Sequence, residues 1–295
     1  MFDQIFGRYL VDSERLTQSQ LDEVIEYETG VRVKLGLLAV AEKLMTQEQA
    51  EEVNKLQAIM DKRFGDIAIM KGYLTEENVM HLLKKQDDIY MLFCQTLVDK
   101  GFMELEQIDE ALSDYQSMEG FTHSDMDNLV SGNIDRTIQV FLPDLSALYG
   151  ELCSVAVRTI LRIIDNKAYV SKAYIVNELQ TDKLAVQRMD GDHSTISGFT
   201  GAGNSLLTLA DTFADEDFGM VDLDALDAVG EFTNCINGLL ASDLSHRKIN
   251  VDMLPPEFYD QPVTIKGEKI CVFPVTIKEQ TINFILAVDS DITIE

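Results

Sequence analysis

The chain is best understood from residues 222–256, which read DLDALDAVGEFTNCINGLLASDLSHRKINVDMLPP. Asp222 is a favourable helix cap, because its side chain can accept hydrogen bonds from backbone N–H groups of the first turn. Apolar residues then recur at steps of three and four, as on one buried helix face: Leu226, Val229, Ile236, Leu240 and Leu244. We therefore predict a long amphipathic helix, followed by a strand that enters Leu254-Pro255-Pro256.

The opposite face of this predicted helix is polar and flat. At about 100° per residue it collects Asp227, Glu231, Asn234, Gly238, Ala241 and Ser245. A glycine inside a helix costs about 1 kcal/mol relative to alanine, which is understandable if another surface comes close to the backbone beside Asn234. A solvated face with a tolerated glycine is the alternative interpretation.

Composition limits the class of protein. A chain of 295 residues is long enough for two domains with cores of their own. The formal charge of -27 argues against nucleic acid and anionic membranes as partners, because both require a positively charged surface. No apolar run approaches the roughly 18 to 20 residues that span a bilayer, and the N-terminus lacks a secretory pattern, so we expect a cytoplasmic protein.

The spacing of cysteines and histidines predicts no metal site. Each of the four histidines is isolated from a second ligand at a suitable distance along the chain, which favours surface or capping positions. The four cysteines form no CxxC motif, so we expect buried free thiols at Cys94, Cys153, Cys235 and Cys271.

The N-terminal part repeats with a period of 29 residues, in lines that begin at Phe6, Leu35, Phe64 and Phe93. Each line reads as a short helix, a turn and a second helix, and Thr17/Gln20 and Thr46/Gln49 have the spacing of a capping box. Self-similarity at a fixed period indicates one repeated unit whose copies cover one another. We therefore predict an all-helical repeat module over residues 1–116.

Two of the four lines keep a basic residue before a glycine, Lys34 with Gly36 and Arg63 with Gly65. With their leucines and the shared spacing, the lines resemble the MshEN domain of type II secretion ATPases. The resemblance implies a cyclic di-GMP site in which the two cations meet phosphates beside the glycine backbones. The alternative, a helical module for protein contacts, agrees better with the acidic composition and with the other two lines, which lack the basic residue.

The remaining chain differs in pattern. Residues 117–143 break the period and are rich in Ser, Gly, Asp and Asn, so we predict a linker, with a strand or strap at 134–141. Residues 144–295 combine helices with alternating apolar runs, and Gly267 is expected to form a hairpin turn between two of them. The order of helix, strands, two helices and strands predicts an α+β domain, an antiparallel sheet with long helices packed on one face.

Glu231 and Asn234 project side by side from the predicted helix, because they stand three residues apart. Such a pair is weak by itself, and Glu51 and Asn54 repeat it in the N-terminal part. The first pair differs in its surroundings, because Gly238 and a proline-terminated strand follow it. In this arrangement residues 145–290 resemble the CheX and CheC chemotaxis phosphatases, in which a long helix carries ExxN and such a strand follows.

The resemblance implies dephosphorylation of the phosphoaspartate of a CheY-like response regulator. In that reaction Asn234 would orient the attacking water and Glu231 would pair with a lysine of the regulator, on a docking face that includes Asp227, Gly238 and Ser245. The resemblance implies no metal or cofactor on this chain, since Mg²⁺ belongs to the regulator. It leaves a homodimer open, as CheX-type domains pair.

Two other functions are compatible with the sequence. The first is a non-catalytic adaptor that docks a response regulator or a flagellar switch component. The second is a cyclic di-GMP receptor, with the N-terminal repeats as the input and the C-terminal domain as the output.

Overall fold

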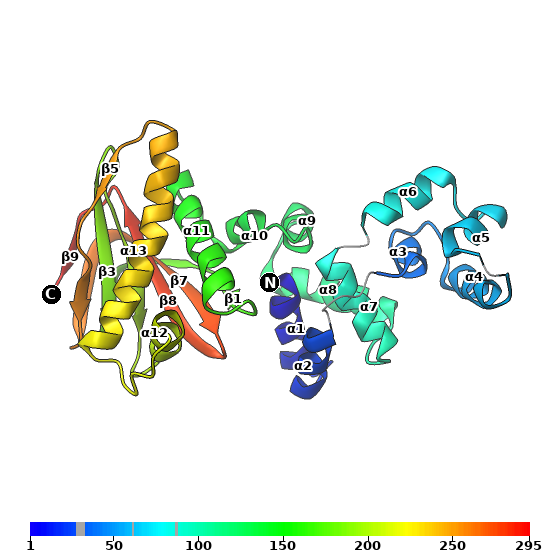
Figure 1. The fold of residues 1–295 in the computed structure, drawn as a ribbon, viewed down its shortest axis with the longest axis horizontal. Coiled ribbons are helices and arrows are strands. Elements are labelled where there is room, and N and C mark those ends of the chain that lie inside the picture. The colour runs from blue at the N-terminus through cyan, green and yellow to red at the C-terminus, as the bar shows by residue number, and fades with distance from the viewer. Residues whose placement is uncertain (28–32, 61, 86–87) are drawn as a thin grey trace. The chain divides into compact units, whose positions relative to one another are not determined.

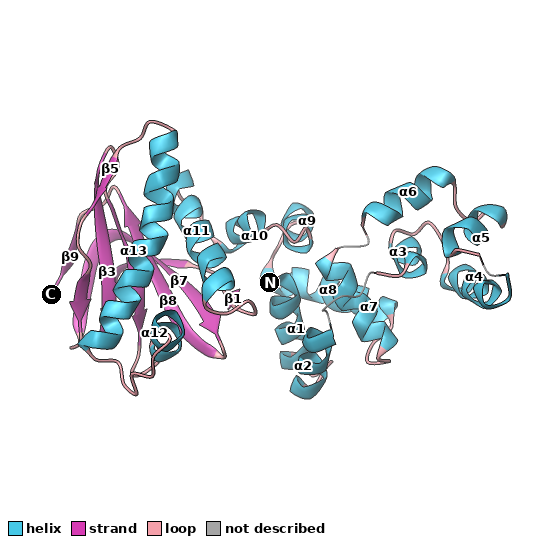
Figure 2. Ribbon diagram, viewed as in Figure 1, coloured by secondary structure: helices cyan, strands magenta, loops and turns pink. Residues whose placement is uncertain are grey.

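The computed structural model describes residues 1–27, 33–60, 62–85 and 88–295. The chain divides into two compact units, Phe2–Gly132 and Asn133–Glu295. The described residues of the first unit form helices joined by turns, whereas the second unit combines helices with a sheet (Figures 1 and 2). Among the helices of the described ranges, none combines the length and the apolarity that a membrane crossing requires.

The described residues of the first unit form successive helices, several of which begin at a capping side chain. The capping boxes predicted at Thr17 and Thr46 are confirmed, because the N–H groups of Gln20 and Gln49 lie 3.3 Å from the threonine hydroxyls and the glutamine side chains accept in return. The helices are α1 (Phe2–Asp12), α2 (Gln18–Tyr27), α3 (Leu35–Ala41), α4 (Gln47–Met60), α5 (Phe64–Met70), α6 (Glu76–Lys84), α7 (Ile89–Asp99), α8 (Leu105–Glu119) and α9 (His123–Val130).

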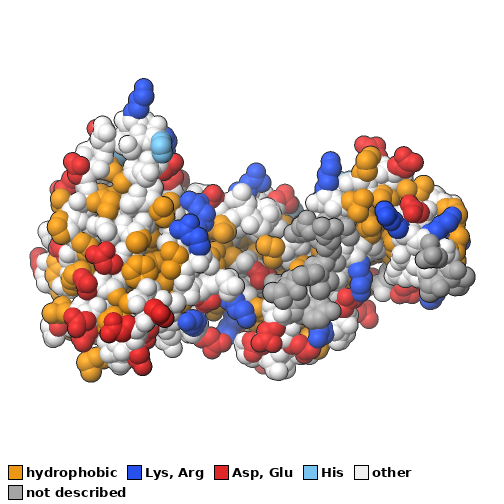
Figure 3. Space-filling model, viewed as in Figure 1, with side chains coloured by type: hydrophobic (Ala, Val, Ile, Leu, Met, Phe, Trp, Pro, Cys, Tyr) orange, Lys and Arg blue, Asp and Glu red, His pale blue; other side chains and the backbone are white. Residues whose placement is uncertain are grey.

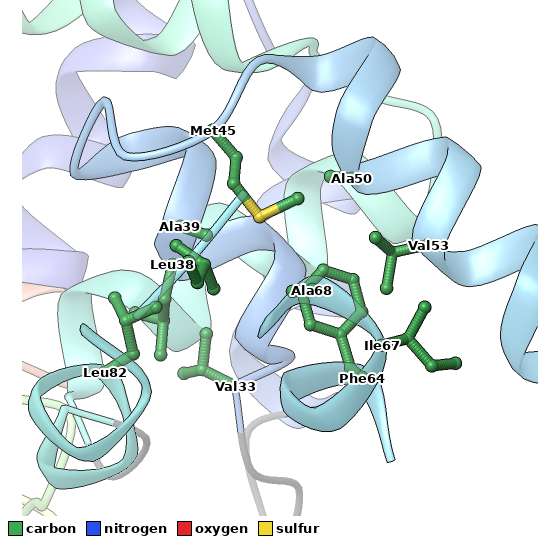
Figure 4. Packing of buried hydrophobic residues seen from close by; sticks show 11 residues of the cluster. Val33, Leu38, Ala39, Met45, Ala50, Val53, Phe64, Ile67, Ala68 and Leu82 are labelled. Atoms are coloured by element: carbon green, nitrogen blue, oxygen red, sulfur yellow. The ribbon is translucent and has the colours of Figure 1, made fainter. Parts of the chain in front are cut away.

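Helices α3 to α6 enclose one apolar core, which Figure 4 shows at close range. Leu38 of α3 and Ile67 of α5 occupy equivalent positions in the second and third lines, and both are buried there. Met45 and Leu74, in the turns that follow, are buried in the same cluster. Because side chains of both lines fill one core, each helix pair covers apolar surface of the other.

The second unit contains both layers of the C-terminal fold. Its first helices are α10 (Ile134–Phe141) and α11 (Ala147–Ile163). The other elements are β1 (Tyr169–Val170), β2 (Tyr174–Thr181), β3 (Lys183–Gly191), β4 (Thr195–Gly201), α12 (Leu207–Ala214), α13 (Leu223–His246), β5 (Val251–Met253), β6 (Glu257–Tyr259), β7 (Val263–Ile277), β8 (Gln280–Val288) and β9 (Ile292–Ile294).

Residues 117–143, where we expected a linker, hold the end of α8 and all of α9 and α10. The strand predicted at 134–141 is wrong, because this segment is helix α10. The side chain of Asn133 caps α10 by accepting the N–H of Arg136 at 3.1 Å. Ile138 and Phe141, three residues apart, are buried on one side of α10, so the apparent alternation reflects a short amphipathic helix.

The predicted antiparallel sheet with helices on one face is confirmed. The strands follow the order β1-β7-β8-β4-β3-β5, while β2 and β9 also pair with β7 and β6 with β3, and the pairs are antiparallel. Figure 2 shows α11 and α13 against one face of this sheet. Leu184 and Val186 of β3 belong to a second apolar cluster on one face of the sheet. Gln187 follows Val186 and therefore points to the opposite face, toward α13.

Gly267 does not form the hairpin turn that the sequence suggested. It lies inside β7, which continues from Val263 to Ile277, and it pairs with Ile292 of β9. A Cβ atom at position 267 would overlap the side chain of Ile292. The glycine therefore admits a neighbouring strand, which a local pattern of residues does not reveal.

Helix α13 has the buried face predicted for it. Leu226, Val229 and Ile236 are fully buried, and the ring of Phe232 lies 5.8 Å from that of Phe199 on β4. Asp222 caps the helix by accepting the N–H of Ala225 at 3.1 Å. With this face held against the sheet, the opposite face of the helix turns outward.

Candidate functional site

Helix α13 presents Glu231 and Asn234 next to one another. Glu231 is exposed and Asn234 is half-buried. The Asn234 Nδ2 atom lies 3.5 Å from Glu231 Oε2, which is the outer limit of a hydrogen bond. The amide and the carboxylate are therefore close enough to contact the same region of a partner.

The carbonyl oxygen of Asn234 is held from beneath by the sheet. Gln187 Nε2, from β3, donates to Asn234 Oδ1 at 2.8 Å and to the backbone carbonyl of Leu254 at 2.8 Å. Leu254 precedes Pro255, and a residue in that place is restricted to extended backbone. The proline-terminated strand therefore supports the site by supplying a fixed acceptor for Gln187.

The hydrogen bonds continue inward from Gln187. Its Oε1 accepts from Asn237 Nδ2 at 2.9 Å, and Asn237 Oδ1 accepts from Ser197 Oγ of β4 at 2.8 Å. Gln187, Asn237 and Ser197 are each at most 1% exposed. The sequence reasoning did not single out these three residues, although polar side chains within apolar runs are a signal of a buried network.

Two glycines of α13 have different surroundings. A Cβ at Gly230 would overlap the ring of Phe258 and lie 3.2 Å from Pro256, so Gly230 allows β6 to approach the helix. A Cβ at Gly238 would meet only the Met253 sulfur, at 4.0 Å. The chain's own packing thus does not require a glycine at 238, which agrees with a position kept small for another surface.

The outward face of α13 is acidic beside the Glu231 and Asn234 pair. Asp227 and Glu231 are exposed like charges four residues apart, a spacing that slightly destabilises a helix. Across the described ranges the structure records no ion pair for either carboxylate. Figure 3 shows acidic and hydrophobic side chains together over this part of the second unit, and Leu223 and Leu254 are among the exposed hydrophobics. Ser245, also predicted for this face, is exposed near the end of α13.

A groove of about 880 Å³ lies between α10, α11 and α13. Leu239, Leu240 and Asp243 line it from α13, together with Arg158 and Arg162 from α11. Glu231 and Asn234 do not line this groove. The pair is placed on the helix surface, where a partner of complementary shape would have to supply the other wall of a reaction site.

The residues predicted for nucleotide binding lie in the first unit. Lys34 precedes α3 and its Nζ pairs with Asp99 at 2.7 Å, while Arg63 precedes α5. Gly36 and Gly65 are buried, and a Cβ at either would lie 2.9 Å from the side chain of Phe64 or Val79 respectively. These glycines serve close helix packing. Binding of cyclic di-GMP by the first unit stays a prediction.

The described residues contain no cluster of three or more side chains that would hold a metal ion. Cys94, Cys153 and Cys271 are buried and free, and burial raises the pKa of the Cys94 thiol to about 12. The expectation of burial is wrong for Cys235, which is free but exposed. Cys235 follows Asn234 on α13 and falls on the outward side of the helix.

Several solved structures resemble the second half of this chain in fold. No curated protein matches the chain in sequence. A CheC-like superfamily protein from Shewanella sp. PV-4 shares 16% identity with a TM-score of 0.43, over 49% of this chain and 99% of that one. A chemotaxis protein CheX from Desulfovibrio desulfuricans shares 16% identity with a TM-score of 0.42, over 48% and 99%.

A chain from the CheX-CheY-BeF3-Mg²⁺ complex of Borrelia burgdorferi shares 15% identity with a TM-score of 0.39, over 50% of this chain and 97% of that one. Among protein families, the one described as "Chemotaxis phosphatase CheX" matches residues 184–276. This match spans β3 to β7 and includes α13 with Glu231 and Asn234. The second unit therefore contains a segment, residues 184–276, that matches the CheX family.

Proposed function

We propose that the second unit is a phosphatase for the phosphoaspartate of a CheY-like response regulator. The observation that carries this proposal is the outward placement of Glu231 and Asn234 on α13, 3.5 Å apart, with the Asn234 amide held by Gln187. The pair lies within the segment that matches the chemotaxis phosphatase family. A surface pair suits a folded protein substrate that brings the reacting group with it.

The chemistry requires little of this chain beyond position. Phosphoaspartate is an acyl phosphate, and its hydrolysis needs a water molecule in line with the phosphorus and the leaving carboxylate. Asn234 holds this water by hydrogen bonding and does not change its own protonation state. Glu231 pairs with a lysine of the regulator and sets the register of the two proteins, which is the role that a charge pair across an interface performs best.

Charge neutralisation of the phosphoryl group falls to the regulator in this proposal. Mg²⁺ is held by the regulator's acidic site, and this chain adds no metal of its own. The carboxylates of Asp227 and Glu231, which form no ion pair with the residues that the structure describes, meet cationic groups of the partner and strengthen its approach at low salt. Asp227, Gly238 and Ser245 form the docking face around the reacting pair.

The test begins with recognition. CheY-like regulators are activated with beryllium fluoride, which imitates the phosphoryl group, and are measured for binding to the full chain. A regulator that binds is then phosphorylated with acetyl phosphate, and phosphate release is followed with and without the chain. We expect release to be accelerated by the wild-type chain and to return nearly to the regulator's own rate with Asn234→Ala.

Two results would contradict this proposal in different ways. Tight binding of the activated regulator without any acceleration of phosphate release would favour the non-catalytic adaptor. Acceleration that survives Asn234→Ala would place the chemistry elsewhere in the chain.

A further inference from the structure

We propose that Gln187 and Asn237 are positioning residues that hold the Asn234 amide in one orientation, with its carbonyl oxygen inward and its NH2 group toward the partner. The proposal rests on the proposed function and deepens it, because it states which atoms of Asn234 the regulator meets. It is carried by the series of hydrogen bonds that joins Ser197, Asn237, Gln187 and Asn234.

The orientation of Gln187 follows from the chemistry of its partners. The Leu254 carbonyl can only accept a hydrogen bond, so the Gln187 atom 2.8 Å from it must be the NH2 nitrogen. The second hydrogen of that NH2 group points to Asn234, 2.8 Å away. Gln187 therefore presents a donor to Asn234, and the atom of Asn234 that faces it must be the carbonyl oxygen.

The outer end of the series leads to the same orientation. A carboxylate accepts hydrogen bonds only, so the atom of Asn234 that faces Glu231 must be the NH2 nitrogen. The inner end is consistent as well, since Asn237 donates to Gln187 and accepts from the Ser197 hydroxyl. In every hydrogen bond of the series, the inner residue donates and the outer residue accepts. In such an arrangement each hydrogen bond polarises the next.

The supporting residues stand on rigid elements. Gln187 and Ser197 are paired in register on β3 and β4, and Asn237 lies one helical turn beyond Asn234 on α13. All three supporting side chains are essentially without solvent exposure. Their conformations are thus limited by packing, which is the condition for holding a reacting group in place.

The consequence for the reaction is specific. The Asn234 oxygen is turned inward toward Gln187, so the atoms that Asn234 directs outward are those of its NH2 group, which donates hydrogen bonds. Such donors bind the oxygen of the attacking water or a phosphoryl oxygen, and leave the water's hydrogens directed elsewhere. Because the Asn234 amide is already oriented in the free protein, the reaction does not have to restrict its rotation to reach the transition state.

The test uses the full chain with Gln187→Met, a replacement of similar length that removes the donors and keeps the volume filled. For a regulator that the wild type dephosphorylates, we expect kcat to fall on the order of 10- to 100-fold with little change in KM. In the Asn234→Ala background, Gln187→Met should cause no further loss of kcat, because Gln187 acts through Asn234.

The control variant is Thr233→Val. Thr233 is fully buried on the same helix, and its hydroxyl donates only to the Val229 carbonyl of that helix, at 2.9 Å. We expect Thr233→Val to keep the wild-type kcat. If Gln187→Met does not fold, as judged by circular dichroism, Asn237→Leu takes its place and should lower kcat in the same way.

A readout on the free protein separates this inference from the proposed function. The Asn234 side-chain NH2 should give a dispersed, rigid pair of nitrogen-correlated NMR signals in the wild type, which become mobile in Gln187→Met. Unchanged Asn234 signals, or an unchanged kcat in an enzyme that Asn234→Ala inactivates, would overturn the inference alone. A wild type without phosphatase activity would overturn the proposed function, while the NMR result would still decide the orientation of Asn234.

Discussion

Helices α4 and α13 carry the same two residue types at the same spacing, Glu51 with Asn54 and Glu231 with Asn234. On α4 both side chains are exposed, and the described residues offer Glu51 one hydrogen bond, from Gln47 of the same helix at 3.5 Å, and Asn54 none. On α13, Asn234 accepts a hydrogen bond at 2.8 Å from a strand of the sheet.

The two pairs have the same spacing along their helices, but they differ in the residues that pack beneath the asparagine. Asn54 stands in solvent, where both orientations of its amide are available. Behind Asn234 lies the buried Gln187, whose NH2 group donates to the backbone carbonyl of Leu254 and to the Asn234 oxygen. One orientation of the Asn234 amide is therefore selected. A pair of residues in sequence thus defines a helix face, while a reactive position also needs support from other elements.

Replacing Asn234 should have the strongest effect of all, and the same replacement at Asn54 is the matched control. Asn234→Ala should lower the rate of regulator dephosphorylation by about 100-fold or more, because it removes a positioned hydrogen-bond donor. Asn54→Ala should leave the rate unchanged. Phosphate release at saturating regulator measures both variants, and equal losses would show that the surroundings of Asn234 are irrelevant.

The two glycines of α13 test how closely the helix is supported. Gly230→Ala should lower the free energy of unfolding by about 1–3 kcal/mol, because the added methyl meets Phe258 and Pro256. Gly238→Ala should raise it by up to about 1 kcal/mol through helix propensity. Urea unfolding measures both changes.

Gly238→Ala has a second expected outcome, in binding. If the flat face of α13 docks the regulator, the added methyl group should weaken binding of the beryllium fluoride form even though the fold gains stability. Affinity equal to that of the wild type would remove Gly238 from the docking face.

Glu231 is expected to contribute to binding of the regulator more than to the rate of phosphate release, and Glu51 to neither. Glu231→Gln keeps the shape and removes the charge, so KM for the regulator should rise about tenfold, and the difference from wild type should shrink at high salt. Glu51→Gln should alter neither. Steady-state kinetics at two ionic strengths provide the measurement, and a salt-independent effect of Glu231→Gln would argue against an ion pair with the regulator.

The smallest effect is expected at the start of α4. Thr46→Ala removes the hydroxyl that accepts the Gln49 N–H and should cost about 1 kcal/mol of stability. Phosphate release should stay at the wild-type rate, because α4 belongs to the first unit and the reacting pair to the second. A lower rate in a variant that remains folded would indicate that the second helix pair contributes to the reaction.

Features that depend on neighbouring residues could be predicted from the amino-acid sequence alone. The caps at Thr17, Thr46 and Asp222, the apolar face of α13 and the antiparallel sheet with helices on one face were all predicted and are confirmed. Each rests on a period of two or of three to four residues, or on contacts within one turn of helix, so that short stretches of chain suffice. The segment 134–141 is one exception, since eight residues are too few to separate the two periods.

The support of the site, in contrast, depends on contacts between segments that are far apart in the sequence. Gln187 is 47 residues from Asn234 and 67 from Leu254, and these three residues meet because β3 passes beneath α13 and beside the end of β5. Gly267 in mid-strand and Gly230 under β6 likewise respond to partners far along the chain. Such contacts depend on strand register and on the packing of helix against sheet, which emerge only when distant segments are brought together.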